Sequence, residues 1–408
     1  MHLCAREEMI SLDCLHISLN RTLLLSVGLW PYQQSNLVRF QIVLLLAILM
    51  TCVIFQFTAF LTSKCTPDFF ISVFSSALLF LVFVIQYTWF YINIEIVKGL
   101  LEQLLNIYDN LTDENEISIM EEYGSYAKRY TIGLILIVII FVCILILYPF
   151  WPQILDILLS TNESLSRPPL SGMFVTEYFV DQKKYFYMTL LHGNAGLFIG
   201  IVIVLATGTL LIAYLKYACG MFRIARIACS YRLKQAFVVD TLRKGSLQNK
   251  NLIYKKLIHA VDMHREALKF SDSSISKFKV MFSLIIVVGV IGASLNFFRL
   301  FQALSFGYAE ELFLPLLSAI VYTSYVFVGD YVAQKVMDHN NDVFVTAYNI
   351  QWYTASLNIQ KMILFLLQRG TKTFSLNIAG LIVGSLEGAV TLLSTILSYF
   401  TVLYSVRT

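Results

Sequence analysis

The chain has 408 residues, of which 58% are hydrophobic and only 14% are charged. Soluble domains carry about 45–50% apolar and about 25% charged residues. This composition therefore excludes an ordinary soluble enzyme or binding domain and indicates a protein that crosses a membrane several times. The formal net charge of +4 gives no indication of a nucleic-acid partner.

Seven apolar runs are near or above the length needed to span a bilayer, which is about 20 residues for an α-helix. Six contain no Asp, Glu, Lys or Arg, and the seventh contains only Glu387. The runs are 41–61, 69–94, 130–155, 185–215, 280–298, 312–329 and 376–405. The sequence therefore predicts an all-α membrane protein with seven transmembrane helices. The fourth run is longer than a bilayer requires, so we expect its helix to tilt or to begin outside the hydrocarbon.

Basic residues predict the orientation, because Lys and Arg stay on the cytoplasmic side of a membrane. With the N-terminus inside, 24 of the 30 Lys and Arg fall on cytoplasmic segments. We therefore expect a cytoplasmic N-terminus and an extracellular C-terminus, which is the reverse of a G-protein-coupled receptor. Among three glycosylation sequons, at Asn20, Asn110 and Asn162, only Asn162 then faces outward.

The sequence contains no recognisable set of catalytic or metal-binding residues. The seven cysteines show no metal-ligand spacing, and no Gly-rich phosphate loop or nucleophile–base set occurs. His259, Asp262 and His264 lie close in sequence, but Asp262 points away from His264 on a helix, so we expect packing rather than a metal site. The sequence predicts no enzyme, no cofactor and no bound metal.

Two cytoplasmic stretches show helical amphipathic patterns. Residues 216–279 place Ile253, Leu257, Ala260, Val261, His264 and Leu268 on one face, and Val332, Val336, Val343, Phe344 and Ala347 form a similar stripe after the sixth run. Such faces need a partner, and we expect them to pack into a helical cytoplasmic anchor domain. Residues 368–372 break the chain before the last run, which predicts a hinge near Gly370.

The last run carries a polar stripe when it is wound as an α-helix with 3.6 residues per turn. One side holds Gly380, Gly384, Glu387, Thr391, Ser394, Ser398, Thr401 and Ser405; the other holds Leu386, Ala389, Leu392, Leu393, Ile396, Phe400 and Leu403. A carboxylate at membrane depth usually faces water or protein interior, so this stripe is typical of a helix lining a water path. Small and hydroxylic residues are equally typical of close helix–helix packing, so both interpretations stay open.

Several segments resemble the insect odorant receptor family. They are QKMILFLLQR at 360–369, LNIAG at 376–380, SLE at 385–387 and SYFTVL at 398–403, together with GLWP at 28–31 and EYFVD at 177–181. The likeness in length and number of spans covers the whole chain, and its style is similar to hymenopteran members. The resemblance implies a subunit of a ligand-gated, non-selective cation channel in which four subunits each contribute the last helix to one pore.

The resemblance also implies partners and a location. An odour-tuned subunit of this family assembles with a common coreceptor in the plasma membrane of olfactory neuron dendrites, in contact with lipid, and binds a small, volatile, apolar ligand. The present chain lacks the long inner insertion of the coreceptor, so it is similar to the odour-tuned subunits.

The site residues follow from that resemblance. The family's pocket lies among the second, third, fourth and sixth spans, where the matching positions are Ser72, Val73, Ser76, Tyr148, Trp151, Tyr185, Met188, His192, Tyr322 and Tyr325. The pore positions are Glu387, Thr391, Ser394, Ser398, Thr401 and Val402. Near the outer gate we favour Val402 over Leu403, because Leu403 falls on the apolar side of the helix.

The expected organisation has six segments. Residues 1–36 form a cytoplasmic lead, 37–215 the first four membrane helices with a ligand-binding outer half, and 216–279 a basic cytoplasmic segment. Residues 280–332 hold the fifth and sixth helices, 333–372 the anchor helices, and 373–408 the pore helix. Two alternatives remain: a seven-helix transporter, which would show paired broken helices, and a metabotropic chemoreceptor, which needs the opposite orientation.

Overall fold

Local capping chemistry fixes where the first membrane helices begin. Ser35 Oγ accepts a hydrogen bond from the Val38 amide at 3.2 Å, and Thr66 Oγ1 accepts one from the Phe69 amide at 3.2 Å. Both satisfy amides that have no partner within the first turn. Pro67, which has no amide hydrogen to leave unpaired, is the first helical residue after Thr66.

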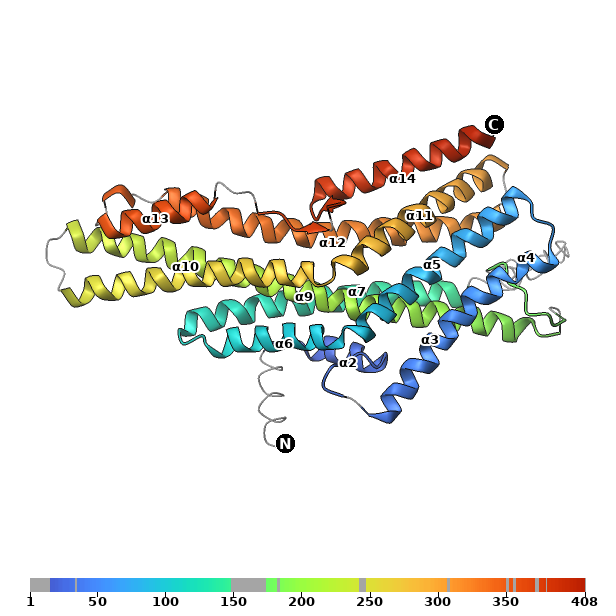
Figure 1. Cartoon of the computed structure of the whole chain (residues 1–408), viewed down its shortest axis with the longest axis horizontal. Helices are drawn as coiled ribbons and strands as arrows, with labels where there is room; N and C mark the ends of the chain where they lie inside the picture. The colour runs from blue at the N-terminus through green and yellow to red at the C-terminus, as the bar shows by residue number, and fades with distance from the viewer. Residues whose placement is uncertain are drawn as a thin grey trace, which may run out of the picture.

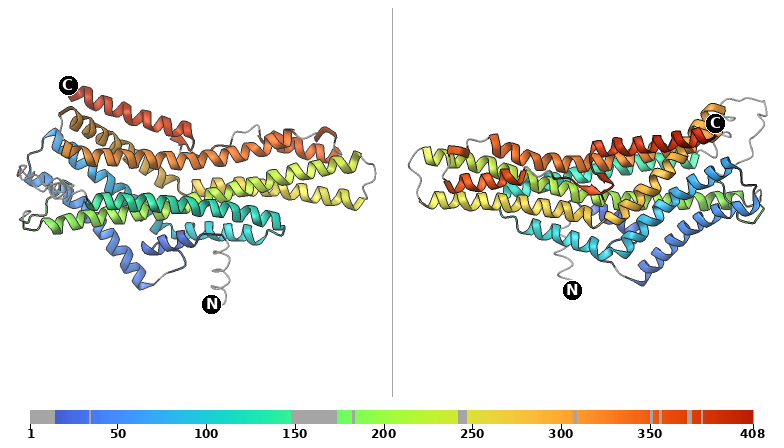
Figure 2. Two further views of the ribbon diagram at one scale, coloured as in Figure 1. Left: turned by 180° about the vertical axis from the view of Figure 1, so that it is seen from behind. Right: turned by 45° about the horizontal axis from the view of Figure 1, so that its top comes forward.

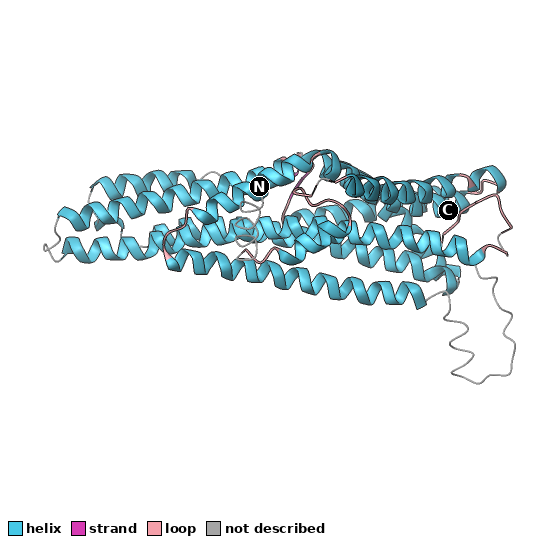
Figure 3. Ribbon diagram, turned by 90° about the horizontal axis from the view of Figure 1, so that it is seen from below, coloured by secondary structure: helices cyan, strands magenta, loops and turns pink. Residues whose placement is uncertain are grey.

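The structure is a computed structural model that describes residues 15–33, 35–147, 174–181, 184–241, 247–306, 309–349, 352–354, 357–370, 374–378 and 380–407. Nearly all of these residues are helical (Figure 3). The helices are α2 (Ser18–Ser26), α3 (Asn36–Phe57), α4 (Ala59–Thr62), α5 (Pro67–Ile92), α6 (Ile94–Asp109), α7 (Glu114–Leu147), α9 (Phe186–Thr241), α10 (Leu247–Ser276), α11 (Lys279–Phe306), α12 (Ala309–Asn349), the short 3₁₀ helix η2 (Trp352–Thr354), α13 (Leu357–Gly370) and α14 (Leu386–Arg407). Strands β1 (Asn377–Ile378) and β2 (Ile382–Val383) form one antiparallel hairpin.

Seven helices in the described part of the chain are long and apolar enough to cross a membrane. They are α3 with α4, α5, α7, α9, α11, α12 and α14. The prediction of a seven-helix, all-α membrane protein is confirmed. Long apolar side chains on α3, α7 and α11, such as Phe40, Ile137 and Val287, are more than half exposed, which suits surfaces facing lipid.

The membrane helices extend directly into a second helical region. Helix α9 runs for 56 residues without a break, about 84 Å at 1.5 Å per residue, so it is far longer than a bilayer is thick. Figure 1 shows α10 and α13 beside the far ends of α9 and α12 at one end of the elongated molecule, with α4 and the C-terminus at the other. We call α10, α13 and these parts of α9 and α12 the anchor. The boundaries expected at 215/216 and 332/333 thus lie inside continuous helices.

The amphipathic faces of the anchor pack against one another. Leu257, Ala260 and His264 on α10 are buried, as are Val336 and Val343 on α12. The opposite face of α10 is charged, and its side chains, among them Lys255 and Asp262, are exposed. The helical periodicity therefore identified which residues form the core of this region.

A buried histidine makes the anchor sensitive to acid. His264 Nε2 lies 3.0 Å from Asn340 Oδ1, and its ring contacts Phe222 and Phe344. Burial lowers the pKa of His264, with Arg369 acting in the same direction, although the hydrogen bond to Asn340 opposes them. In the unfolded chain the His264 ring takes up a proton near pH 6.5, whereas in the folded chain it does so only at a lower pH. The free energy of unfolding should then fall by up to about 1.4 kcal/mol per pH unit as the pH drops below about 6.5.

Thermal unfolding of the purified protein between pH 8 and pH 5.5 measures this dependence. His264→Phe should make the acid side of the curve less steep, because one titrating histidine is gone while the buried His339 remains. His259→Gln, which replaces a more exposed histidine on the same helix, serves as the control for losing a histidine from α10. A His264→Phe curve as steep as that of the wild type would contradict the assignment.

The chain before α14 differs from the prediction. The described residues at 376–378 and 380–385 do not continue the last helix; 377–378 and 382–383 form the β1–β2 hairpin, and α14 begins only at Leu386. Gly380 has a φ of +75°, which favours glycine, and its amide donates to Asn377 Oδ1 at 2.7 Å. Placing Gly380 and Gly384 on the polar stripe of a helix was therefore wrong. The predicted break near Gly370 is confirmed, because α13 ends there.

Candidate ligand pocket and ion path

Helix α14 packs through one face only. Ala389, Leu392 and Ile396 are buried, and α14 lies against α11 and α12 (Figure 2). The Ser294 hydroxyl of α11 donates to the Ile396 carbonyl at 3.1 Å. The apolar side predicted for this helix is therefore its contact with the rest of the chain.

The opposite face of α14 is exposed and polar. Glu387, Thr391, Ser394, Ser398 and Thr401 all lie there. Three hydroxyls donate to carbonyls of their own helix: Thr391 to Glu387 at 2.9 Å, Ser398 to Ser394 at 2.8 Å and Thr401 to Ser398 at 2.8 Å. Each hydroxyl oxygen keeps lone pairs that can accept hydrogen bonds from water. Val402 is 58% exposed, whereas Leu403 is half-buried.

The start of α14 is fixed to α12. Ser385 Oγ accepts a hydrogen bond from the Gly388 amide at 3.0 Å and so caps the helix. The Ser385 amide also lies near the carboxylate of Asp330, a buried residue of α12, and interacts favourably with its charged form. Gly384 lies against Ala333 one turn further along α12. Asp330 was not singled out from the sequence, although an acidic residue at the end of an apolar run is a signal that could have found it.

The Tyr322 side chain projects from α12 toward α11 and α5. Its ring lies against Gly289, and its hydroxyl lies near Gly292 and Leu78. The hydroxyl is buried and makes no hydrogen bond within the described chain. A buried donor without a partner is costly, and this hydroxyl is one of the few enclosed side-chain atoms left unsatisfied in the described residues.

Tyr325 lies one turn further along α12, beside Gln86 of α5. Gln86 Nε2 donates to Thr207 Oγ1 of α9 at 2.6 Å, while Gln86 Oε1 is buried and makes no hydrogen bond in the described residues. This polar contact joins three helices inside an otherwise apolar region. Sequence reasoning missed Gln86 and Thr207, although polar residues within apolar runs were a visible signal.

Ser76 of α5 and His192 of α9, two of the predicted pocket residues, contact a different neighbour, α3. Val73 is fully buried, and the Ser76 hydroxyl donates to Gln56 Oε1 of α3 at 2.8 Å; the backbone carbonyl of Ser72 accepts from the Ser76 hydroxyl at 3.1 Å. His192 lies between Tyr178, at 2.8 Å from its Nδ1, and Thr51 of α3, at 3.0 Å from its Nε2.

A small cavity of about 30 Å³ opens beside this histidine. It is lined by Phe174, Thr176, Tyr178, Thr189, Leu190, Gly193 and Asn194. That volume holds about one water molecule, whereas ligand pockets occupy about 300 Å³ or more. An odorant-sized ligand would therefore have to displace side chains here.

Four predicted residues do not join either group. Tyr185 is 43% exposed and Met188 is 69% exposed. Tyr148 and Trp151 lie outside the described residues, as does the sequon residue Asn162. The structure thus brings the predicted residues to two places: Tyr322 and Tyr325 where α12 meets α5 and α11, and Ser76 and His192 against α3.

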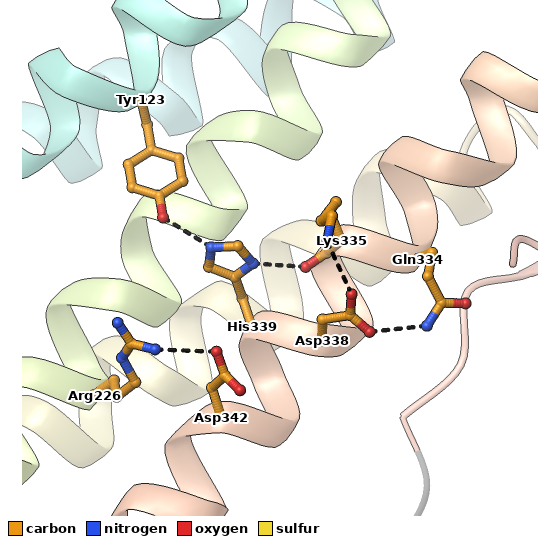
Figure 4. Close-up of polar contacts among 7 residues, drawn as sticks. All are labelled: Tyr123, Arg226, Gln334, Lys335, Asp338, His339 and Asp342. Carbon is orange, nitrogen blue, oxygen red and sulfur yellow. Dashed lines mark hydrogen bonds and ion pairs between the residues drawn. The ribbon is translucent and has the colours of Figure 1, made fainter. Parts of the chain in front are cut away.

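A polar cluster occupies the part of α12 that follows these tyrosines (Figure 4). His339 Nδ1 donates to the Lys335 carbonyl at 2.7 Å, and its Nε2 lies 2.7 Å from the Tyr123 hydroxyl of α7. Asp342 pairs with Arg226 of α9 at 3.0 Å. These contacts hold α7, α9 and α12 together where the apolar runs end.

The sequence profile described as 7tm odorant receptor matches residues 66–396 of the chain. That match covers most of the 408 residues. The protein belongs to the 7tm odorant receptor family. No curated protein sequence matches this odorant receptor closely.

Two solved structures share its fold. The insect olfactory receptor OR5 from Machilis hrabei in complex with eugenol superposes with a TM-score of 0.71 at 14% identity, over 96% of this chain and 97% of that one. A second structure of the same receptor superposes with a TM-score of 0.70 at 16% identity, over 99% of both chains. At 14–16% identity the two structures share the fold of this odorant receptor, and this likeness does not extend to the side chains of the pocket.

Proposed function

We propose that this odorant receptor is the odour-binding subunit of a heteromeric, ligand-gated, non-selective cation channel. The observation that carries the proposal is the exposed face of α14, where a membrane-length helix turns a carboxylate and four hydroxyls away from its own subunit. Such a face is costly against lipid but suits water. Four copies around an axis would line a path for hydrated cations.

The ligand is a small, volatile and largely apolar molecule. The eugenol complex of the related receptor supports this size and polarity. We place its binding where α12 meets α5 and α11, because the Tyr322 hydroxyl and Gln86 Oε1 are polar atoms without partners in an apolar setting. One or two hydrogen-bonding groups among apolar side chains are typical of ligand sites.

Co-expression with an odorant receptor coreceptor tests the proposal. Membrane current would be recorded during an odour panel from cells with this chain alone, the coreceptor alone, and both. We expect odour-evoked cation current with both chains and an odour spectrum that this chain sets. Equal spectra with and without this chain would reject an odour-binding role.

Glu387 is expected to concentrate cations at the inner end of the path. One charge acting at about 4 Å in water contributes about 1 kcal/mol, or about fivefold in local cation concentration. Glu387→Gln should therefore lower single-channel conductance by up to about fivefold without affecting surface expression. Ser405→Ala, at the other end of α14, serves as the control because it changes no charge. Unchanged conductance in Glu387→Gln would remove this role.

Glycosylation mapping tests the orientation that the basic residues predict. With the N-terminus in the cytoplasm and the C-terminus outside, Asn162 receives a glycan and Asn110 does not. Asn20 is a poor acceptor in either orientation, since its side chain is 2% exposed. Asn162→Gln should abolish the glycan shift on a gel, whereas Asn110→Gln should leave it. The converse result would reverse the topology and exclude the proposed channel arrangement.

The cellular setting follows from the same proposal. We place the receptor in the plasma membrane of olfactory neuron dendrites, assembled with the coreceptor as a heterotetramer. The exposed apolar residues on the anchor, such as Phe365 on α13 at 72% exposure, support assembly with other subunits there.

A further inference from the structure

Lys216 on α9 is a nearly buried cation. The residue is 8% exposed, and its ammonium pairs with no carboxylate among the described residues, although the Nζ atom itself is not fully enclosed. Its Nζ lies 4.3 Å from the centre of the Tyr130 ring on α7. A cation over an aromatic face gains some stabilisation, but a buried ammonium normally also needs acceptors for its three N–H groups.

Lys335 of α12 is a second cation near Lys216, and its repulsion adds to the cost of burying the Lys216 ammonium. Lys216 is repelled by Lys335 of α12, and it also interacts with Tyr331, the residue one turn before Lys335. Lys335 Nζ lies 5.5 Å from the Tyr331 ring. Lys216 of α9 thus interacts with Tyr130 of α7 and with Tyr331 and Lys335 of α12, and α9 packs against both of those helices.

The nearby carboxylates are used by other groups (Figure 4). Asp338 accepts from Gln334 at 2.9 Å and pairs with Lys335 at 3.5 Å. Asp342 pairs with Arg226, and on α7 Glu122 lies 4.0 Å from Arg223. Lys335 thus forms an ion pair with the half-exposed Asp338, whereas Lys216 forms none among the described residues.

Lys216 and its neighbours lie where three apolar runs end. Tyr130 begins the third run, Lys216 directly follows the fourth, and Tyr331 lies two residues beyond the sixth. The fold brings these three sequence boundaries to one level, which is the depth of the lipid headgroups. On the topology proposed above this is the cytoplasmic leaflet, which holds the anionic lipids.

We propose that Lys216 and Lys335 form a binding site for the phosphate of an anionic lipid headgroup. The two ammonium groups donate to the phosphate oxygens, and the Tyr130 and Tyr331 phenols contact the glycerol region. The bound anion supplies the acceptors that Lys216 lacks and removes the repulsion between the two lysines. This site is independent of the odorant, since it lies beyond the expected membrane-facing pocket on another part of α12.

Lipid binding to the purified full-length complex tests the site. Thermal unfolding in micelles would be titrated with dioctanoyl phosphatidylserine, with dioctanoyl phosphatidylcholine as the neutral lipid. Phosphatidylserine should stabilise the wild type more. Lys216→Gln and Lys335→Gln should each weaken its apparent affinity about fivefold, the factor for one lysine at an anionic surface. Lys98→Gln should bind like the wild type, since Lys98 pairs with Glu102 on α6.

Two further measurements keep the proposal open to refutation if Lys216→Gln fails to fold. A photoreactive phosphatidylserine should label wild-type peptides that contain Tyr130 or Tyr331; labelling confined to other peptides would overturn the site. Inorganic phosphate at the same concentration should stabilise the protein much less than the lipid. Equal stabilisation by phosphate would show that a soluble anion, and not a headgroup, occupies the site. Unchanged lipid affinity in both lysine variants would also end the proposal.

Discussion

Asp330→Leu is expected to reduce the odour-evoked current by up to about tenfold while leaving the protein at the cell surface. The Asp330 carboxylate is buried on α12 and lies near the Ser385 amide at the start of α14. A contact of ordinary hydrogen-bond strength contributes about 0.5–1.5 kcal/mol. Tyr322 and Tyr325 lie on the same helix within about two turns, so this contact connects the proposed ligand contacts to the proposed pore helix. Losing it should weaken the coupling between the two by about twofold to tenfold.

Two variants on α12 separate coupling from general damage. Asp330→Asn keeps one oxygen that can accept the Ser385 amide, so its loss of current should be smaller. Asp338→Asn changes a half-exposed carboxylate whose ion pair with Lys335 contributes little, so we expect nearly wild-type current. Whole-cell current would be compared with the amount of receptor at the surface for each variant. Full current in Asp330→Leu, or equal losses in all three, would contradict a role for Asp330 in connecting α12 to α14.

The features that the sequence predicted are those that depend on the surroundings of a single helix. The bilayer sets the length of each apolar run, so seven charge-poor runs gave seven helices. The burial of Leu257, Ala260 and His264 follows from their spacing on one helical face. The exposed polar side of α14 from Glu387 to Thr401 follows from the same periodicity.

Features that depend on where helices cross could not be found this way. Gln86 meets Thr207, and His192 meets Thr51, across more than one hundred residues. Neither pairing leaves a local pattern. The continuation of α9 to Thr241 was missed for another reason: residues 216–241 contain no proline, and the basic charges there were interpreted as a separate segment. The hairpin at Gly380 was missed because its flanking residues are apolar enough to continue a span.

The packing of α9 against α3 and α5 gives the second large expected effect. Gly196 and Gly200 are separated by one helical turn, a spacing that allows close helix contact in membranes. A side chain at Gly196 would meet Cys52 of α3, and one at Gly200 would overlap the ring of Phe83 on α5. Phe83 is itself 6% exposed and has little room to move. Gly200→Ala should therefore destabilise the protein by about 1–3 kcal/mol through overpacking.

Gly208 on the same helix provides a matched control, because nothing lies within 4 Å of the position its Cβ would take. Gly208→Ala should be neutral or stabilising by up to about 1 kcal/mol, the helix preference of alanine over glycine. The two changes are chemically identical, so the opposite signs isolate the contact with Phe83. Thermal unfolding in detergent measures both. In a Phe83→Ala background, which is itself destabilised by a cavity, Gly200→Ala should cost much less because the obstructing ring has gone. Equal costs in the two backgrounds would mean that the strain at Gly200 arises elsewhere than at the α5–α9 contact.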